Sequence, residues 1–300
     1  MKYFLYLAVI FFLQGHCLAQ PTDKKLQKQM EDFVKGYGGD IGIYIKDLHT
    51  GKIVAINADT IFPTASIVKI PILLGVVDKI NRGELFYDSA FVYKDSLLYE
   101  GEDILGSFKN NEKILLKKLI LLMLTTSDNT ASLWLQSLAG KGSRINEILD
   151  SLGFQFTRVN SRTPGREANR SVYGWGQTTP KEMAEIIEMI YRDKIYSAPM
   201  CERMKRCLGR NFWDEDEAIS QIPPNIEVFS KNGCVDESRN EILLVNAPHH
   251  PYILSIFTKN NKDTSWVHSN AAWVLTRKIS RYLWNYFEPG DKWTSTLVPD

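Results

Sequence analysis

The chain has 300 residues, of which 44% are hydrophobic and 24% are charged, a composition typical of a globular protein that is long enough to bury a sizeable core. One large domain and two lobes are both compatible with this length. The formal net charge is +1 and the sequence has no basic run or stripe, so neither nucleic acid nor an acidic membrane surface is expected as a partner.

The first residues have the pattern of a signal peptide. Lys2 supplies a positive charge, an apolar run of 11 residues follows it, and small residues precede Gln20. The run is shorter than the roughly 17–25 residues that a membrane-spanning helix needs. We therefore predict a signal peptide over residues 1–19, no stable membrane span, and an exported protein that is periplasmic or secreted.

Three cysteines remain after such a cleavage, namely Cys201, Cys207 and Cys234. An odd number leaves at least one thiol unpaired within the chain, and a sequence does not tell which two would form a disulfide. The histidines lack the spacing of zinc ligands, and no Cys-x-x-Cys motif is present. We therefore expect neither a metal nor another cofactor.

The predicted elements begin with a helix over residues 22–39, which starts at a cap on Thr22 or Asp23 and ends at a pair of glycines. A hairpin follows over residues 40–57, where two alternating runs flank a turn with a glycine. From about residue 64 to 210 the pattern is mostly helical. The helical runs are SIVKIPILLGVVDKINRGE, EKILLKKLILLMLTTS, NTASLWLQSLAG, GSRINEILDSLG and TPKEMAEIIEMIYRDK.

A long irregular stretch interrupts these helices between about residues 154 and 178, and long loops in compact domains are usually functional. Strand-like runs return as NIEVFSKNG, RNEILLVNA and PYILSIFT, and a final helix covers residues 270–287. We predict an α/β fold of the α+β type. One antiparallel sheet covered by the terminal helices would form from residues 20–63 and 215–300, and an all-α lobe from residues 64–214.

A lysine follows a serine by three residues in TASIVKIP, within an otherwise apolar run. On a helix, Ser66 and Lys69 would share one face, and free N–H groups near the helix start would favour negative charge developing at Ser66. A lysine desolvated by apolar neighbours has a lowered pKa and can accept the serine proton. The alternative is a lysine that extends to solvent beside a capping serine. Pro71 departs from the helix pattern, and such departures often mark functional sites.

Two further polar motifs follow. SDN at residues 127–129 lies between two apolar helical runs, either as a turn and helix cap or as a proton relay and substrate clamp. KNG at residues 231–233 ends a strand-like run. It is either a strand end that turns at glycine, or a place where the glycine lets a substrate approach, Lys231 supplies positive charge and the next N–H stabilises an oxyanion.

In this order, in a chain with a signal peptide, the three motifs resemble those of the serine β-lactamase and penicillin-binding protein superfamily, and of class A β-lactamases in particular. The family triplet is Ser-x-x-Lys, Ser-Asp-Asn, and Lys-Thr-Gly or Lys-Ser-Gly. The stretches MLTTSDNTASLWL, GQTTPKEMAEII and ESRNEILLV extend the resemblance over nearly all of the chain after the signal peptide. It implies an α/β sandwich lobe and an all-α lobe with the site between them.

The resemblance implies a role for each residue of the acylation step. Ser66 would be the nucleophile that becomes acylated, and Lys69 would be its base. Ser127 would pass a proton to the leaving nitrogen. The oxyanion hole would consist of the backbone N–H groups of Ser66 and Cys234, whose thiol is expected to be a packed small side chain rather than a second nucleophile.

Substrate binding follows in the same way from the resemblance. Asn129 would hold the substrate amide, and Lys231 and Arg239 would face a substrate carboxylate. Gly233 would let the substrate lie along the strand. Asn232 replaces the hydroxyl residue of the family motif; its amide can still donate to a carboxylate, but with a different reach.

The irregular loop departs from the class A pattern, in which a Glu-x-x-x-Asn motif supplies the glutamate that activates the deacylating water. Here Glu167 is followed by Asn169 after only one intervening residue, and Glu167 is the sole carboxylate between Arg158 and Pro180. Glu167 is therefore either that base or a solvent-facing glutamate paired with Arg166 or Arg170.

Three functions remain open from the sequence. The first is a class A-type β-lactamase that opens the β-lactam ring through an acyl-enzyme on Ser66. The second is a D,D-peptidase or esterase on the same scaffold. The third is a penicilloyl-trapping protein that deacylates poorly. The partner would be a small β-lactam or a peptidoglycan-like peptide, and the chain is expected to be a monomer.

Overall fold

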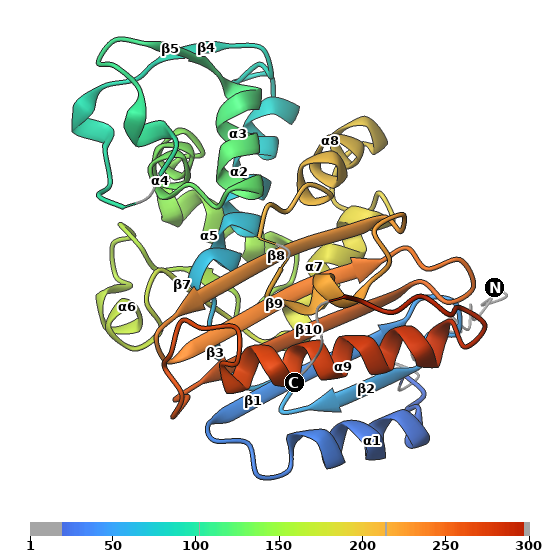
Figure 1. The fold of residues 1–300 in the computed structure, drawn as a ribbon. Helices are drawn as coiled ribbons and strands as arrows, with labels where there is room; N and C mark the ends of the chain where they lie inside the picture. The colour runs from blue at the N-terminus through green and yellow to red at the C-terminus, as the bar shows by residue number, and fades with distance from the viewer. Residues whose placement is uncertain (1–19, 102, 214, 297–300) are drawn as a thin grey trace, which may run out of the picture.

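The computed structural model describes residues 20–101, 103–213 and 215–296, so that the predicted signal peptide lies outside the described residues. A five-stranded antiparallel sheet runs through the molecule in the order β2-β1-β10-β9-β8 (Figure 1). The strands are β1 (Asp40–Asp47), β2 (Ile53–Ile56), β8 (Val228–Val235), β9 (Ser238–Val245) and β10 (Tyr252–Lys259). Both ends of the chain contribute strands, which confirms the predicted α+β fold.

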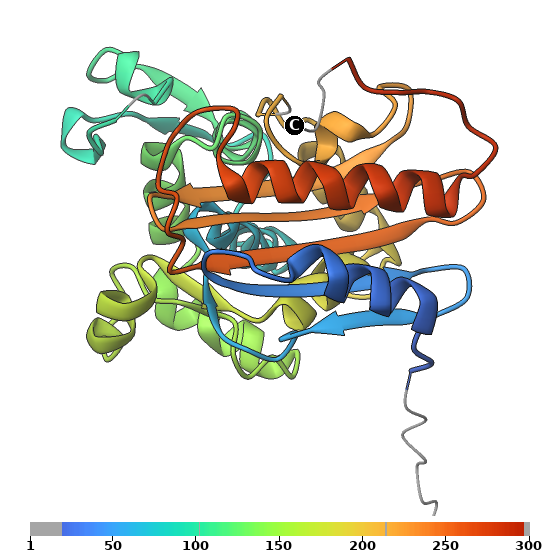
Figure 2. The same cartoon turned by 60° about the horizontal axis from the view of Figure 1, so that its bottom comes forward.

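Two helices cover one face of this sheet, as Figures 1 and 2 show. They are α1 (Lys24–Val34) and α9 (Ala271–Phe287), and their apolar sides form one core with the sheet. Asp23, rather than Thr22, caps α1 by accepting a hydrogen bond from the Leu26 N–H at 3.1 Å. Every residue of β9 is buried, because side chains cover the sheet on both faces.

The other face carries the helical part of the chain, in which α7 packs against β1, β9 and β10. The central helix α2 (Lys69–Asn81) is buried without interruption from Lys69 to Val77, as expected of a helix that is apolar all round. Pro71 does not break it, because it lies in the first turn, where its missing N–H is not needed. The other helices are α3 (Leu116–Thr125), α4 (Asn129–Leu138), α5 (Lys141–Ser151), α7 (Pro180–Tyr191) and α8 (Ala198–Leu208).

The stretch that the sequence presents as irregular contains short elements. A small sheet joins β3, β7 and β6, and the helix α6 lies between the last two of these along the chain. Buried Glu182 holds the start of this stretch, since its carboxylate accepts the backbone N–H groups of Gln155, Phe156 and Thr157. The elements are β3 (Phe62–Pro63), β6 (Arg158–Val159), α6 (Glu167–Tyr173) and β7 (Gly176–Thr178); a further pair is β4 (Ala90–Val92) and β5 (Lys113–Leu115).

Within the described part of the chain, no helix is long and apolar enough to cross a membrane. Cys201 and Cys207 are buried on the same helix, α8, and these two and Cys234 are free thiols. The boundaries of the sheet lobe and the helical lobe stay a prediction.

Candidate active site

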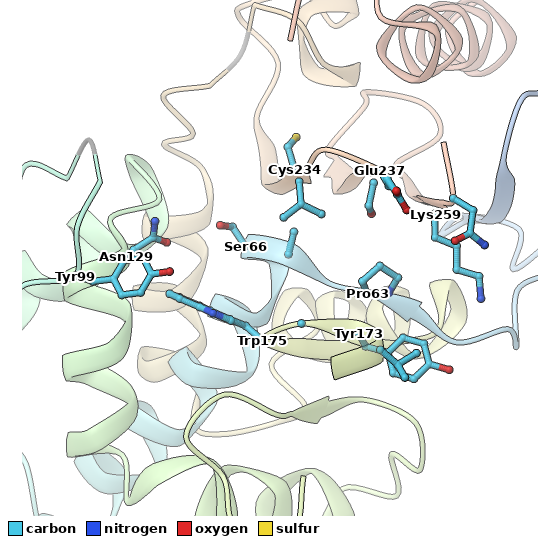
Figure 3. Close-up of a pocket in the computed structure, with 15 residues that line it drawn as sticks. Pro63, Ser66, Tyr99, Asn129, Tyr173, Trp175, Cys234, Glu237 and Lys259 are labelled. Carbon is cyan, nitrogen blue, oxygen red and sulfur yellow. The ribbon is translucent and has the colours of Figure 1, made fainter. Parts of the chain in front are cut away.

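Ser66 lies in a short 3-10 helix, η1 (Ala65–Val68), that leads directly into α2. Ala65 precedes it with a φ of +45°, a left-handed conformation that is strained for a residue with a Cβ. Ser66 opens into a cavity of about 520 Å³, here called the Ser66 pocket (Figure 3). The pocket is lined by Pro63, Ala65, Ser66, Tyr99, Asn129, Val172, Tyr173, Gly174, Trp175, Cys234, Val235, Glu237, Ser238, Lys259 and Asn260.

Lys69 does not extend to solvent but is fully buried behind Ser66. Its Nζ lies 3.1 Å from the Ser66 Oγ, 2.9 Å from the Ser127 Oγ and 2.8 Å from the Asn129 Oδ1, and it also donates to the Ser127 carbonyl. Burial lowers the pKa of Lys69 well below its ordinary value, and the charge of Lys231 lowers it further. A neutral amine at this place can accept the Ser66 proton.

The SDN motif forms the turn between α3 and α4, and it serves both as a helix cap and as part of the pocket. Asp128 caps α4 by accepting the Ala131 N–H at 2.7 Å, and its other oxygen accepts the Leu105 N–H at 2.8 Å. Ser127 adopts a φ of +61°, a conformation that is uncommon for a residue with a Cβ. The turn brings Ser127 and Asn129 to Lys69, and the Asn129 oxygen is bound there, which leaves its amide nitrogen to donate to a substrate.

Gly233 is the place where the edge strand β8 meets the turn that carries Ser66. A Cβ at Gly233 would lie 2.4 Å from the Thr64 carbonyl oxygen and 2.8 Å from the Ser66 nitrogen, so only glycine fits. This contact sets Cys234 against the same pocket as Ser66. It is the approach that the predicted oxyanion hole, from the N–H groups of Ser66 and Cys234, requires.

Lys231 and Asn232 form a second buried cluster, together with a residue that the sequence analysis missed. The Lys231 Nζ donates to the Asn232 carbonyl and to its Oδ1, both at 2.9 Å. The Asn232 Nδ2 donates to the Oε1 of buried Glu217 at 2.7 Å. Burial lowers the pKa of Lys231, an effect that the Glu217 carboxylate opposes, and burial raises the pKa of Glu217. No local motif marks Glu217, which follows three other acidic residues in the sequence.

Arg239 is not brought to the pocket as predicted. Its guanidinium is buried against two tryptophan rings, 4.2 Å from the Trp266 centroid and 5.0 Å from that of Trp273. It donates to the carbonyls of Val235 and Ser265, the latter at 2.9 Å. The cause is the strand register, which pairs Arg239 with Cys234 and places Glu241 opposite Asn232. The expectation that Arg239 faces a substrate carboxylate is therefore corrected. Its guanidinium N–H groups bind backbone carbonyls and stabilise the fold instead.

Glu167 is likewise absent from the pocket. It is the first residue of α6, its side chain is exposed, and its Oε1 accepts the Gly165 N–H at 3.2 Å. Arg166, one of its predicted partners, donates instead to the Asn160 Oδ1 at 3.0 Å and to the Gln177 Oε1 at 2.7 Å. The role of Glu167 as a water-activating base is corrected by this placement.

Aromatic residues that the motifs do not predict form another wall of the pocket. The rings of Tyr99 and Trp175 meet edge to face, with centroids 5.1 Å apart, although the residues come from segments far apart in sequence (Figure 3). Thr130, next to the SDN motif, accepts the Tyr99 N–H at 3.0 Å. The Trp175 carbonyl accepts the N–H groups of Asn160 and Ser161 at 2.8 and 3.0 Å. Flanking glycines mark Trp175 in the sequence, but nothing local indicates its partner.

Comparisons with known proteins agree with this architecture. The Beta-lactamase enzyme family matches residues 25–287. The Beta-lactamase VEB-1 of Pseudomonas aeruginosa is 23% identical over 296 residues, which is 94% of this chain and 96% of that protein. Beta-lactamase 3 of Bacillus cereus is 25% identical over 243 residues, 76% of this chain and 72% of that protein.

Solved structures share the fold. A mutant of PBP-A, solved as an acyl-enzyme complex with penicillin G, superposes with a TM-score of 0.79 at 21% identity, covering 90% of this chain and 98% of that one. A beta-lactamase from Chitinophaga pinensis superposes with a TM-score of 0.78 at 17% identity, covering 87% and 99%. The chain therefore belongs to the beta-lactamase enzyme family, as a serine hydrolase of the β-lactamase and penicillin-binding protein superfamily that is nearest to class A.

Proposed function

We propose that this protein is an exported, monomeric serine hydrolase that β-lactams acylate at Ser66 and that releases the acyl group slowly. The observation that carries the acylation half is the hydrogen-bonded cluster of Ser66, Lys69 and Ser127 around an amine whose pKa is lowered. The signal-peptide pattern supports export. The substrate would be a small β-lactam or a peptidoglycan-like peptide that enters the Ser66 pocket.

Acylation follows from the positions of these groups. In its neutral form, which the lowered pKa favours, the Lys69 amine can accept the Ser66 proton across 3.1 Å while the Ser66 oxygen attacks the carbonyl carbon. The N–H groups of Ser66 and Cys234 would stabilise the oxyanion; one such donor is worth on the order of 100- to 1,000-fold in rate. Ser127 then donates its proton to the leaving nitrogen and is reprotonated by Lys69, 2.9 Å away.

The family pattern places the base for deacylation on the loop around α6, and the described residues of this loop put no acidic side chain into the pocket. The loop around α6 lines the pocket with Val172, Tyr173, Gly174 and Trp175, none of which is acidic, while Glu167 faces solvent. A positioned general base contributes typically 100- to 10,000-fold to such a step. Without it, the acyl-enzyme should form faster than it is hydrolysed and should accumulate.

The geometry thus favours the penicilloyl-trapping function over a rapidly hydrolysing β-lactamase. A D,D-peptidase or esterase would share the acylation machinery and differ in the acyl donor.

Intact-protein mass spectrometry after mixing the mature protein with benzylpenicillin tests the proposal. Most chains should carry the mass of the drug for minutes, and Ser66→Ala should carry none while its thermal midpoint stays near that of the wild type. Fast steady turnover without a detectable adduct would contradict slow deacylation, and an adduct on Ser66→Ala would contradict the nucleophile.

A further inference from the structure

A buried carboxylate lies directly behind the third motif, on the face of β8 turned away from Ser66. Glu217 precedes the short helix η4 (Ala218–Gln221), and only 5% of its surface is exposed. Its Oε1 accepts the Asn232 Nδ2 at 2.7 Å and lies 3.6 Å from the Cys234 Sγ. Two alternate positions of β8, Asn232 and Cys234, therefore direct their side chains to one carboxyl group.

This carboxylate fixes the orientation of the Asn232 amide. The Asn232 Oδ1 accepts from the Lys231 ammonium at 2.9 Å, while its Nδ2 faces Glu217. The reverse orientation would set the amide N–H groups against an ammonium and the amide oxygen against a carboxylate, and both contacts would be repulsive. Glu217, Asn232 and Lys231 thus form one chain of hydrogen bonds with opposite charges at its ends.

A second carboxylate belongs to the same cluster. Glu241 lies opposite Asn232 in the strand register, is fully buried, and accepts the N–H groups of Ala218 and Ile219 at 2.6 and 3.2 Å. Burial, and then the charge of Glu217, raises the pKa of Glu241 well above its ordinary value. The carboxyl groups of Glu217 and Glu241 and the amino group of Lys231 are thus buried in one cluster.

Lys231 already has the Glu217 carboxyl group as its partner through Asn232, so a substrate carboxylate would bring further negative charge into a buried site, and burying an uncompensated charge is costly. We propose that Glu217 is a positioning residue that acts as the built-in counter-ion of Lys231, so that the site accepts acyl donors without a carboxylate beside the reacting bond as readily as carboxylated ones. The inference rests on the proposed acylation of Ser66 and extends its substrate class to neutral esters, amides and esterified β-lactams.

Other cations of the described pocket do not replace Lys231 as an anion site. The Arg239 guanidinium is buried against the Trp266 ring, 4.2 Å from the ring centroid. Lys259 lines the pocket together with Glu237, at the end away from Asn129 (Figure 3). The Lys259 Nζ donates to the Ile61 carbonyl at 3.0 Å.

The first test compares benzylpenicillin with its methyl ester on the wild-type protein, by the second-order rate constant for adduct formation in intact-protein mass spectrometry. The two rate constants should agree within about threefold. A pocket that binds the carboxylate through a charge-assisted hydrogen bond would favour the acid by roughly 10- to 150-fold. A preference for the acid of more than tenfold therefore overturns the inference while leaving acylation of Ser66 intact; adduct formation by neither compound overturns both.

The second test is Glu217→Gln, which keeps an oxygen for the Asn232 Nδ2 and removes the charge. The ratio of acid to ester should rise at least tenfold, because the acid now brings the counter-ion that Lys231 lacks. The alkaline limb of the pH profile with the ester should move to lower pH, since the Lys231 ammonium loses the charge that holds its proton. Glu241, Cys234 and Asp216 also act on this pair. Because the charge of Glu217 raises the pKa of Glu241, Glu217→Gln/Glu241→Gln is measured beside the single variant, and its ratio of acid to ester should also rise at least tenfold.

Asp216→Asn is the matched control. It removes the same charge one residue away, from a side chain that pairs with His268 at the surface. Its ratio of acid to ester should stay within twofold of the wild type. A Glu217→Gln/Glu241→Gln protein that is folded but keeps the wild-type ratio and pH profile overturns the inference. If Glu217→Gln does not fold, the wild-type comparison of acid and ester decides.

Discussion

Lys69 and Lys231 are both fully buried lysines close to the turn that carries Ser66, and their surroundings differ. Neutral oxygens of Ser66, Ser127 and Asn129 surround the Lys69 nitrogen, whereas Lys231 is linked through Asn232 to the Glu217 carboxylate. Burial lowers the pKa of both lysines. The bonded partner, and not burial alone, therefore sets which lysine can act as a base and which stays a cation.

The largest effects, on acylation for one lysine and on stability for the other, are expected when each lysine is replaced with methionine. Lys69→Met should lower the acylation rate constant on the order of 100- to 10,000-fold, because it removes the general base. Lys231→Met should instead lower the unfolding free energy by roughly 3–5 kcal/mol, less to the extent that Glu217 takes up a proton, because it leaves a buried carboxylate without its cation. Mass spectrometry and thermal unfolding measure the two effects. Wild-type labelling of Lys69→Met, or wild-type stability of Lys231→Met, would break the distinction.

The next largest effect is expected at Gly233, where the strand that carries Lys231 meets the turn that carries Ser66. Gly233→Ala would place a Cβ 2.4 Å from the Thr64 oxygen, so that β8 must move away from Ser66. We expect a loss of roughly 1–3 kcal/mol in unfolding free energy, with slower acylation. Gly38→Ala is the control, because a Cβ there would lie 3.6 Å from its nearest neighbour, Lys262. Equal behaviour of the two variants in chemical denaturation would contradict the role of Gly233.

A smaller effect is expected in the way the contribution of Lys69 to the unfolding free energy changes with pH. Because the folded-state pKa of Lys69 is lowered, the unfolded chain binds more protons, so this residue's contribution to stability is lost as pH falls below the ordinary lysine value. The unfolding free energy of the wild type, minus that of Lys69→Met, should therefore rise from pH 7 to pH 10, by at most about 1.4 kcal/mol per pH unit. Denaturant unfolding across this range measures it. A flat difference would mean that buried Lys69 stays protonated.

The smallest effect is expected from Glu167→Gln. The side chain is exposed and bonded to the Gly165 N–H, so the rate of acyl-enzyme decay should change by less than about twofold. Decay is followed as the loss of the penicillin adduct by mass spectrometry. A tenfold slower decay would show that Glu167 reaches the acyl group and would restore it as the base for deacylation.

Much of the fold was predictable from local patterns. The helix behind Asp23, the first hairpin, the final strands and the terminal helix each follow from apolar periodicity and from caps that act over a few residues. The short strands β3, β6 and β7 were not singled out, because elements of two or three residues carry no period. The 11-residue helix α8 was not singled out either.

Local spacing is enough to predict the elements, the order of the three motifs and the pairing of Ser66 with Lys69, since a separation of three residues keeps two side chains together on any helix. The groups that face Asn232 depend instead on how distant segments pair. The turn at Asp236 and Glu237 sets the register of β8 and β9, and that register brings Glu241 to Asn232 and turns Arg239 away. Strand register and loop orientation depend on contacts between distant segments, which local spacing does not encode.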